Sequence, residues 1–333
     1  MMTRYSVALG AAGLFSLGAG TAHANVTFIN SNIVDPLNPT FTQALGINDT
    51  STIVGYGNGS IFNGFELTLP PVPANFTRQN VPGANGGTQV IGISGTGTTV
   101  GFSITGATTS GFAQTGGTFT PVNAPGTAFN QLLGINKSGT VAAGYSSTDP
   151  TGATLQKAFT VSGGPLFSSP SFTDITDINA LLPVNFNSQA TGVNDAGTVV
   201  GFYDYDGLGD FSSFEDMAGM VTSFQPFGSL SSQALGVNNL GDIVGDYIDG
   251  GGVMHGYLDV GGVFTSFDPS GSAGTTANGI NDLGQIVGFY TDANDNTIGF
   301  LAQVPEPATL VLFGSGLAGL ALVRRRKHTR GAA

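Results

Sequence analysis

The stretch GINDLGQIVGFYTD at residues 279–292 decides the fold, because related copies of it recur along the chain. Successive copies are 46, 42, 58, 44 and 43 residues apart. A repeat period near 45 residues predicts stacked supersecondary units. The six copies begin at Gly46, Gly92, Gly134, Gly192, Gly236 and Gly279.

Each copy combines a tight turn with a short apolar strand. The turn Asn281-Asp282-Leu283-Gly284 suits a hairpin, since Asn and Asp bond to their own backbone and Gly accepts positive φ. The following GQIVGFY has apolar residues of both parities, so this strand needs cover on both faces. Ser51 departs from the pattern and leaves the geometry of the first turn open. The other copies carry Gly97, Gly139, Gly197, Gly241 and Gly284 there.

Two further β-prone runs follow each hairpin. One is a Gly-aromatic step such as Gly256-Tyr257, weaker at Ala158-Phe159 and Ser213-Phe214, and the other is an FT-type run such as VFTSFD at residues 263–268. Four antiparallel strands per unit predict a β-propeller, in which neighbouring blades cover both faces of each sheet. Glycines recur inside the second strand, where crowding between blades near the axis would explain them. These are Gly55, Gly101, Gly144, Gly201, Gly245 and Gly288.

The two ends of the repeat region complement each other. The last copy stops at residues 299–302 without an FT-type run, whereas NVTFIN at residues 25–30 resembles that missing strand. We therefore predict an all-β, six-bladed propeller over residues 25–303, with residues 26–29 completing the blade begun at Gly279. Closure of this kind removes free sheet edges. An open β-solenoid is the alternative.

Residues 1–24 predict a secretory signal peptide. Arg4 precedes an apolar run at residues 7–20 and the small-residue pair Ala22 and Ala24, so we expect cleavage after Ala24. A buried apolar segment is the alternative. The chain has no cysteine, which excludes thiolate metal sites and cysteine nucleophiles and leaves packing to stabilise an exported body.

The C-terminal residues 304–333 have a different character. Pro305-Glu306-Pro307 precedes an apolar span at residues 308–323, followed by Arg324, Arg325, Arg326 and Lys327. This tail resembles the PEP-CTERM sorting signal of Gram-negative bacteria. The resemblance implies export, transient anchoring of a transmembrane segment in the inner membrane, and processing by an exosortase near Pro305, Glu306 and Pro307. The cluster of basic residues places the tail in the cytoplasm and the body outside. A permanent single-pass anchor is the alternative.

The repeats over residues 40–302 are similar to the HAF-type GIND/VNDxGxIVG repeats of bacterial secreted proteins. That resemblance carries no assigned catalytic residues. Residues 25–304 hold 20 acidic and three basic residues, a formal charge of −17. A field of this sign excludes nucleic acid as a partner.

Catalytic patterns are not evident. His255 is the one histidine of the body, no GxSxG-type elbow accompanies it, and we interpret it as a partly packed strand residue. We predict that the chain is not an enzyme and needs no cofactor, a glycan hydrolase being a remote alternative.

Acidic loops after the second strand raise a calcium hypothesis. Carboxylate and amide oxygens are the ligands that calcium takes, and residues 292–296 begin like an EF-hand loop, although Thr297 and Gln303 depart from it. Turn residues that bond to their own backbone are the alternative. The possible ligands are Asp204, Asp206, Asp210, Asp292, Asn294 and Asn296.

The same rim offers Tyr205 and Phe211 as aromatic platforms for a glycan, with core packing as the alternative. We therefore expect a secreted structural or adhesive protein of the cell surface, biofilm or exopolysaccharide matrix, with exosortase as a partner. Carbohydrate binding, with or without calcium, is the second hypothesis.

Overall fold

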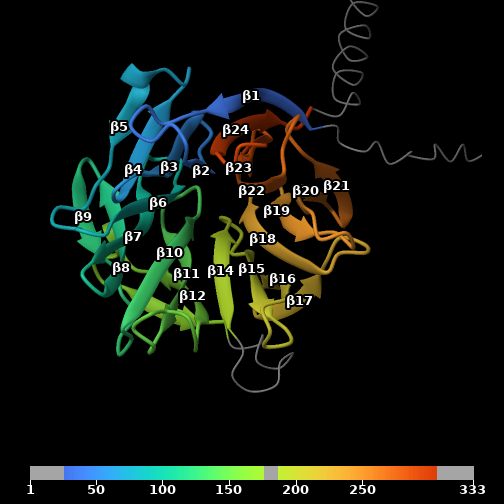
Figure 1. Ribbon diagram of the computed structural model, residues 1–333. Helices are drawn as coiled ribbons and strands as arrows, with labels where there is room; N and C mark the ends of the chain where they lie inside the picture. Colours follow the sequence, from blue (N-terminus) through green and yellow to red (C-terminus); the bar gives the residue numbers. More distant parts are fainter. Residues whose placement is uncertain (1–25, 176–186, 306–333) are drawn as a thin grey trace, which may run out of the picture.

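The computed structural model describes residues 26–175 and 187–305, and this part of the chain is almost entirely β-strand (Figure 1). Its only helical turns, Pro73–Asn75 and Pro165–Phe167, span three residues each. The predicted signal peptide and transmembrane segment lie outside the described residues. Within those residues, no helix has the length and apolar character that a membrane crossing requires.

Strands of the first half form three antiparallel groups of four, and single parallel bridges, Phe62 with Gly87 and Phe129 with Thr109, join these groups into one 12-stranded sheet. The strands of each group are given from the innermost to the outermost. The first group contains β2 (Thr42–Ile47), β3 (Thr52–Asn58), β4 (Phe62–Thr68) and β5 (Phe76–Arg78). The second contains β6 (Gly87–Ile93), β7 (Thr99–Thr105), β8 (Thr108–Thr115) and β9 (Thr118–Pro121). The third contains β10 (Phe129–Ile135), β11 (Val141–Ser147), β12 (Lys157–Ser162) and β13 (Ser171–Asp174).

Three more groups follow with the same order. The fourth contains β14 (Ser188–Val193), β15 (Val199–Asp204), β16 (Phe211–Met217) and β17 (Met220–Phe224). The fifth contains β18 (Ser231–Val237), β19 (Ile243–Ile248), β20 (Met254–Val260) and β21 (Val263–Phe267). The sixth contains β22 (Gly274–Ile280), β23 (Gln285–Thr291), β24 (Thr297–Gln303) and β1 (Thr27–Ile33).

β1 supplies the outer strand of the sixth group, whose other strands come last in the sequence (Figure 1). Thr27 pairs with Gln303 and Ile33 with Gly299. The Phe28 ring meets the Phe300 ring edge-on, with centroids 5.4 Å apart, and Ile33 is fully buried. Both chain ends of the described body are therefore joined in one sheet.

Innermost strands contact one another all the way around, from β2 and β6 through to β22 and back to β2. A glycine lies at each of these contacts. A Cβ added to Gly279 would lie 3.2 Å from the Cα of Gly46, and one added to Gly46 would lie 3.1 Å from the Cα of Gly92. Close approach of backbones near the axis explains why each repeat begins with glycine.

The second-strand glycines have a different role, and their predicted explanation is wrong. A Cβ on Gly55 would collide with the Gln43 backbone and the Phe65 ring of its own group rather than with a neighbouring group. Gly55 and Phe65 face each other across β3 and β4, and Phe65 is fully buried. The glycine therefore makes room for the aromatic side chain of the third strand. The aromatics of the other groups, Phe112, Phe159, Phe214, Tyr257 and Phe300, are also buried.

The GIND turns have the geometry expected of a left-handed glycine. φ is +82° at Gly97 and +70° at Gly284. Ser51 adopts the same conformation with φ +59°, and its N–H donates to the Asn48 carbonyl at 2.9 Å. The first turn therefore matches the others despite its side chain.

Candidate functional site

The six innermost strands surround an axial channel whose two ends are chemically different. We call the end formed by the GIND turns, including Asn48 and Asp49 and their equivalents, the turn end. We call the opposite end the glutamine end, because five of the six strands place a glutamine there. Its ring consists of Gln43, Gln89, Gln131, Gln189, Gln233 and, in the sixth group, Thr276.

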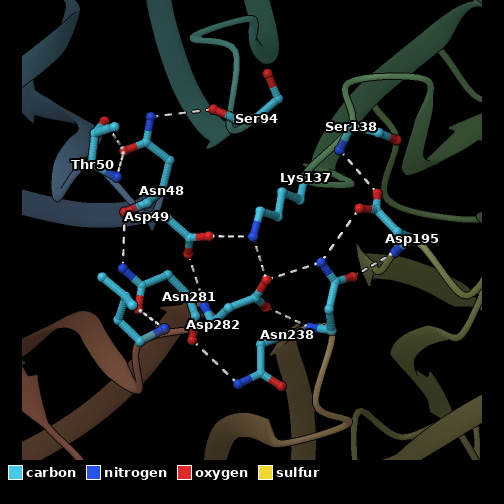
Figure 2. Close-up of polar contacts among 12 residues, drawn as sticks. Asn48, Asp49, Thr50, Ser94, Lys137, Ser138, Asp195, Asn238, Asn281 and Asp282 are labelled. Carbon is cyan, nitrogen blue, oxygen red and sulfur yellow. Dashed lines mark hydrogen bonds and ion pairs between the residues drawn. The ribbon is translucent and has the colours of Figure 1, made fainter.

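At the turn end, asparagine amides connect neighbouring groups (Figure 2). The Asn281 Nδ2 donates to the Asn48 carbonyl at 2.9 Å, and the Asn238 Nδ2 donates to the Asn281 carbonyl at 3.2 Å. Asn194 and Asn48 make equivalent bonds to the carbonyls of Asn238 and Ser94. These buried amides are thereby committed to holding the groups together.

A second tier of contacts follows the same direction. The Asp282 N–H donates to Asp49 Oδ1 at 3.0 Å, and the Asn239 N–H donates to Asp282 Oδ1 at 2.8 Å. Lys137 reaches across the channel, with its Nζ 2.8 Å from Asp282 and 2.5 Å from Asp49 (Figure 2). Hydrogen bonds to Asp282 and Asp49 raise the pKa of Lys137. Hydrogen bonds and the Lys137 ion pairs therefore connect the polar groups of the turn end to one another.

The glutamine end encloses a cavity of about 450 Å³, which is in the range of small-ligand sites. The side chains of Gln43, Gln89, Gln131 and Gln233 make no hydrogen bond to any residue that the structure describes. Gln189 donates from Nε2 to Gln156 at 2.8 Å. Aromatic walls surround these amides, formed by Tyr56, Phe102, Phe202 and Phe289.

Asp246 interrupts the series of aromatic residues that follow the second-strand glycines. It occupies the position after the second-strand glycine where the other five repeats carry Tyr or Phe, and it lines the cavity with its carboxyl buried. Burial raises the pKa of Asp246 to about 7, although the polarity of the neighbouring Thr276 hydroxyl acts in the opposite direction. Nearby, Asn278 Oδ1 is buried without a hydrogen-bond partner among the described residues. The sixth side of the ring is therefore polar and incompletely bonded.

The glutamine end lies on the same side as the acidic loops. Gln233 pairs with Asp246 near the end of β19, just before the loop that contains Asp249. Asp249 accepts hydrogen bonds from the N–H groups of Gly251 and Val253 at 2.8 and 2.9 Å. The loops that follow the second strands thus form the rim of the cavity.

Residues of the calcium hypothesis form turns on this rim. Asp292 Oδ1 accepts from the N–H groups of Asn294 and Asn296 at 2.8 and 2.9 Å. Asp204 Oδ1 accepts from Gly207 at 2.7 Å, while Asp210 is exposed. Across residues 26–175 and 187–305, no cluster of three or more His, Asp or Glu side chains is placed to hold a metal ion. Calcium binding stays a prediction.

The predicted rim aromatics are in different surroundings. Tyr205 is 40% exposed and its hydroxyl donates to the Leu230 carbonyl at 3.3 Å. Phe211 begins β16 and packs edge-on against Phe202, with ring centroids 5.0 Å apart. Tyr205 is thus available to a ligand, whereas Phe211 supports the wall of the cavity.

His255 lies on β20 between two carboxylates. Its Nδ1 is 2.7 Å from Asp268 and its Nε2 is 3.4 Å from Asp249. The ring packs against Tyr247 at a tilt of 33°, with centroids 5.3 Å apart. The hydrogen bond to Asp268 raises the pKa of His255. Within the described residues no hydroxyl is hydrogen-bonded to this ring, so the geometry is that of a paired histidine rather than of a nucleophile and its base.

Sequence reasoning missed the glutamine end. The signal was present in TQALGI, TQVIGI, NQLLGI, SQATGV and SQALGV, in which Gln stands three residues before the glycine. Asp246 was also visible, as the acidic residue of GDY where the other copies read GFY, GFS, GYG or GYS. Neither pattern matches a catalytic motif, and only the ring brings these residues together.

Comparison with known proteins identifies the tail. Residues 303–327 match the PEP-CTERM protein-sorting motif. The match contains Pro305, Glu306, Pro307, Arg324, Arg325 and Arg326, of which only Pro305 is among the described residues. It confirms the predicted sorting signal, which begins at the last residue of β24. No curated protein matches the chain.

Solved structures resemble the body in fold alone. A protein from Agrobacterium tumefaciens assigned as TolB aligns with a TM-score of 0.53 and 11% identity, over 85% of this chain and all of its own. An α-L-arabinanase from Penicillium chrysogenum with arabinobiose aligns with a TM-score of 0.49 and 11% identity, over 84% of this chain and 99% of its own. A lectin mutant from Aleuria aurantia with Fucα1-6GlcNAc gives 0.47 and 8%, over 79% and 91%. The fold is of propeller type.

Proposed function

We propose that the chain is an exported, non-enzymatic protein that an exosortase sorts to the cell surface or extracellular matrix, where it has a structural or adhesive role. The observation that supports this most strongly is the PEP-CTERM match at residues 303–327. The match begins where β24 ends, so the signal follows the folded body without an intervening domain. Processing near Pro305 would leave every described strand intact.

We infer that the body is a six-bladed propeller closed by β1. Support comes from the glycine contacts between successive innermost strands and from the pairing of β1 with β24. A parallel bridge between Phe41 and Thr297 also links the first and sixth groups. In an open solenoid these first and last units would lie far apart.

Carbohydrate binding is the second candidate function, and the glutamine end favours it. Free amides can donate to and accept from sugar hydroxyls, while aromatic walls pack against the apolar faces of a sugar ring. A glycan array on the exported protein tests this function, with and without millimolar calcium. Silence across neutral and amino sugars would exclude a lectin role, and identical profiles in calcium and chelator would exclude calcium assistance.

Sorting is tested in a Gram-negative host with and without a functional exosortase. Mass spectrometry of the surface or released protein is expected to find a C-terminus near Pro305, and the host without exosortase is expected to retain the Arg-rich tail in its membrane fraction. Replacement of Pro305, Glu306 and Pro307 by alanine in the intact host should reproduce that retention. Surface protein that still carries Arg324 to Arg326 would contradict the proposal.

A further inference from the structure

The cavity at the glutamine end has one side that differs from the other five. The first four groups pair a ring glutamine with an aromatic residue. The fifth group pairs Gln233 with Asp246, and the sixth pairs the shorter Thr276 with Phe289. Thr276 donates weakly to the Met254 sulfur at 3.5 Å. Two departures from the repeat thus occur side by side and leave a polar notch, defined by Asp246, Thr276 and Met254.

Comparison of the six repeats shows which residues the fold alone requires at the positions of this notch. Positions that serve the fold, such as the axial glycines and the buried third-strand aromatics, keep the same kind of residue around the ring. An aromatic residue at position 246 would satisfy packing as it does in the other five groups. A buried carboxyl instead carries a desolvation penalty unless a cation or a donor compensates it. Its presence therefore indicates a ligand that supplies this compensation.

The charges of Asp246 and of the whole body indicate which class of ligand the cavity would bind. Asp246 is the only charged side chain among the described residues that line the cavity, and the body around it has a formal charge of −17. Anionic ligands are repelled by this field, whereas a cation gains from both the field and the low-dielectric notch. The free amides of Gln43, Gln89, Gln131 and Gln233 add partners for several hydroxyl groups.

We propose that the glutamine end binds a saccharide residue that bears a protonated amine, with the amine at Asp246 and the hydroxyl groups at the glutamine ring. This inference rests on the carbohydrate-binding function and deepens it. The notch orients the ligand. The glutamines are equivalent and could bind the sugar in several orientations, whereas the amine has a single carboxylate partner in the cavity. Aromatic side chains such as Phe289 and Phe202 enclose the apolar faces of the sugar.

The test compares two oligosaccharides that differ only in the amine. Titration calorimetry of the exported protein with tetramers of glucosamine and of N-acetylglucosamine, at pH 7.5 and physiological salt, is expected to show at least tenfold tighter binding of glucosamine. Asp246→Asn should reduce this ratio to about one. Asp295→Asn is the control, because Asp295 is an exposed carboxylate on the same rim that belongs to neither the notch nor the set of possible calcium ligands. It should preserve the preference.

Other outcomes separate the inference from the functions on which it rests. A preference that survives in Asp246→Asn would place the amine on the acidic rim and overturn the assignment. Equal binding of both tetramers by the unmodified protein would overturn the amine but keep a carbohydrate site. Absence of binding by either would remove carbohydrate binding as well, without touching exosortase sorting. A Gln131→Ala, Gln233→Ala double variant should weaken both tetramers at least tenfold, and unchanged binding would contradict the glutamine ring.

Discussion

The two ends of the axial channel are built from the same six strands but use their polar residues in opposite ways. At the turn end, amides donate to neighbouring carbonyls and Lys137 pairs with Asp49 and Asp282. At the glutamine end, four recurring amides have no partner among the described residues, and no cation of this part of the chain pairs with Asp246. Recurrence of a polar residue therefore does not by itself indicate structure or binding. A structural role is indicated where the recurring side chain forms hydrogen bonds within the protein, and a binding role where it does not.

Both ends depend on the ring closure proposed above, so the largest expected effect comes from removing it. Deleting residues 25–31 takes away Phe28, which packs on Phe300 and Phe267, and exposes the edge of β24. We expect a loss of roughly 4 kcal/mol or more in the free energy of unfolding, together with aggregation. Urea denaturation and sedimentation measure both.

The control for this deletion is Ile29→Ser, because Ile29 lies on the same strand with 56% of its surface exposed. It should leave stability nearly unchanged. A stable, monomeric deletion variant would mean that β1 does not close the ring.

Asp246→Asn tests whether the glutamine end is kept at a cost to stability. The folded-state pKa of about 7 lies above the reference value of 3.8, so the folded protein binds the extra proton between these pH values. The contribution of Asp246 to the free energy of unfolding is therefore most favourable below about pH 4, and this advantage is lost as the pH rises through 7.

We therefore expect Asp246→Asn to raise the free energy of unfolding at pH 8 by on the order of 2–4 kcal/mol and to change it little at pH 4. Denaturation curves at both pH values measure this difference. A variant that is equally destabilised at both pH values would indicate an ordinary structural carboxylate.

A direct contrast of the two ends is possible with single alanine substitutions. Asn281→Ala removes the bond to the Asn48 carbonyl and the acceptor for the N–H groups of Leu283 and Gln285. We expect it to cost roughly 2–3 kcal/mol, whereas Gln131→Ala should cost less than about 0.5 kcal/mol. Similar costs from urea titrations of the two variants would erase the distinction.

The smallest expected effects concern backbone strain at the turn end. Gly97 has φ +82° and open space around its Cβ position, so Gly97→Ala should cost about 1 kcal/mol through conformation alone. Ser51→Gly relieves the same strain but loses the 2.8 Å bond from Ser51 Oγ to Gln285. A net gain below about 1 kcal/mol follows, and thermal unfolding of both variants resolves their opposite signs.

Much of the fold could be predicted because each repeat carries its local signals. Turn glycines, apolar residues on both faces of the second strand, and FT-type outer strands all have sequence periods that strand physics explains. The six copies are also similar enough to indicate the missing outer strand, and β1 occupies that place. The sorting signal needed no fold at all, since its order of motifs is linear.

The rest could not be predicted because it depends on a bulge and on the ring. Each innermost strand shifts register next to its axial glycine, as between Ala44 and Gly46. Such a bulge redirects side chains, so strict alternation does not show what faces the channel. Gln43 and Asp246 are 203 residues apart in the sequence, and only the arrangement of the strands around the axis places both in the wall of one cavity. The role of Gly55 was misassigned for the same reason, since its partner lies within its own sheet.

The pairing of β1 with β24 also has a kinetic consequence. Thr27 and Gln303 are separated by 276 residues, and contacts of such long range form late because chain entropy opposes them. Under the proposed export, which begins at the N-terminus, β1 leaves the cytoplasm first and β24 last, so β1 cannot make its hydrogen bonds until β24 has followed. Until then the sixth group lacks the pairing of β1 with β24. Folding of the body can therefore be completed only once Gln303, which lies beside the sorting signal, has been exported.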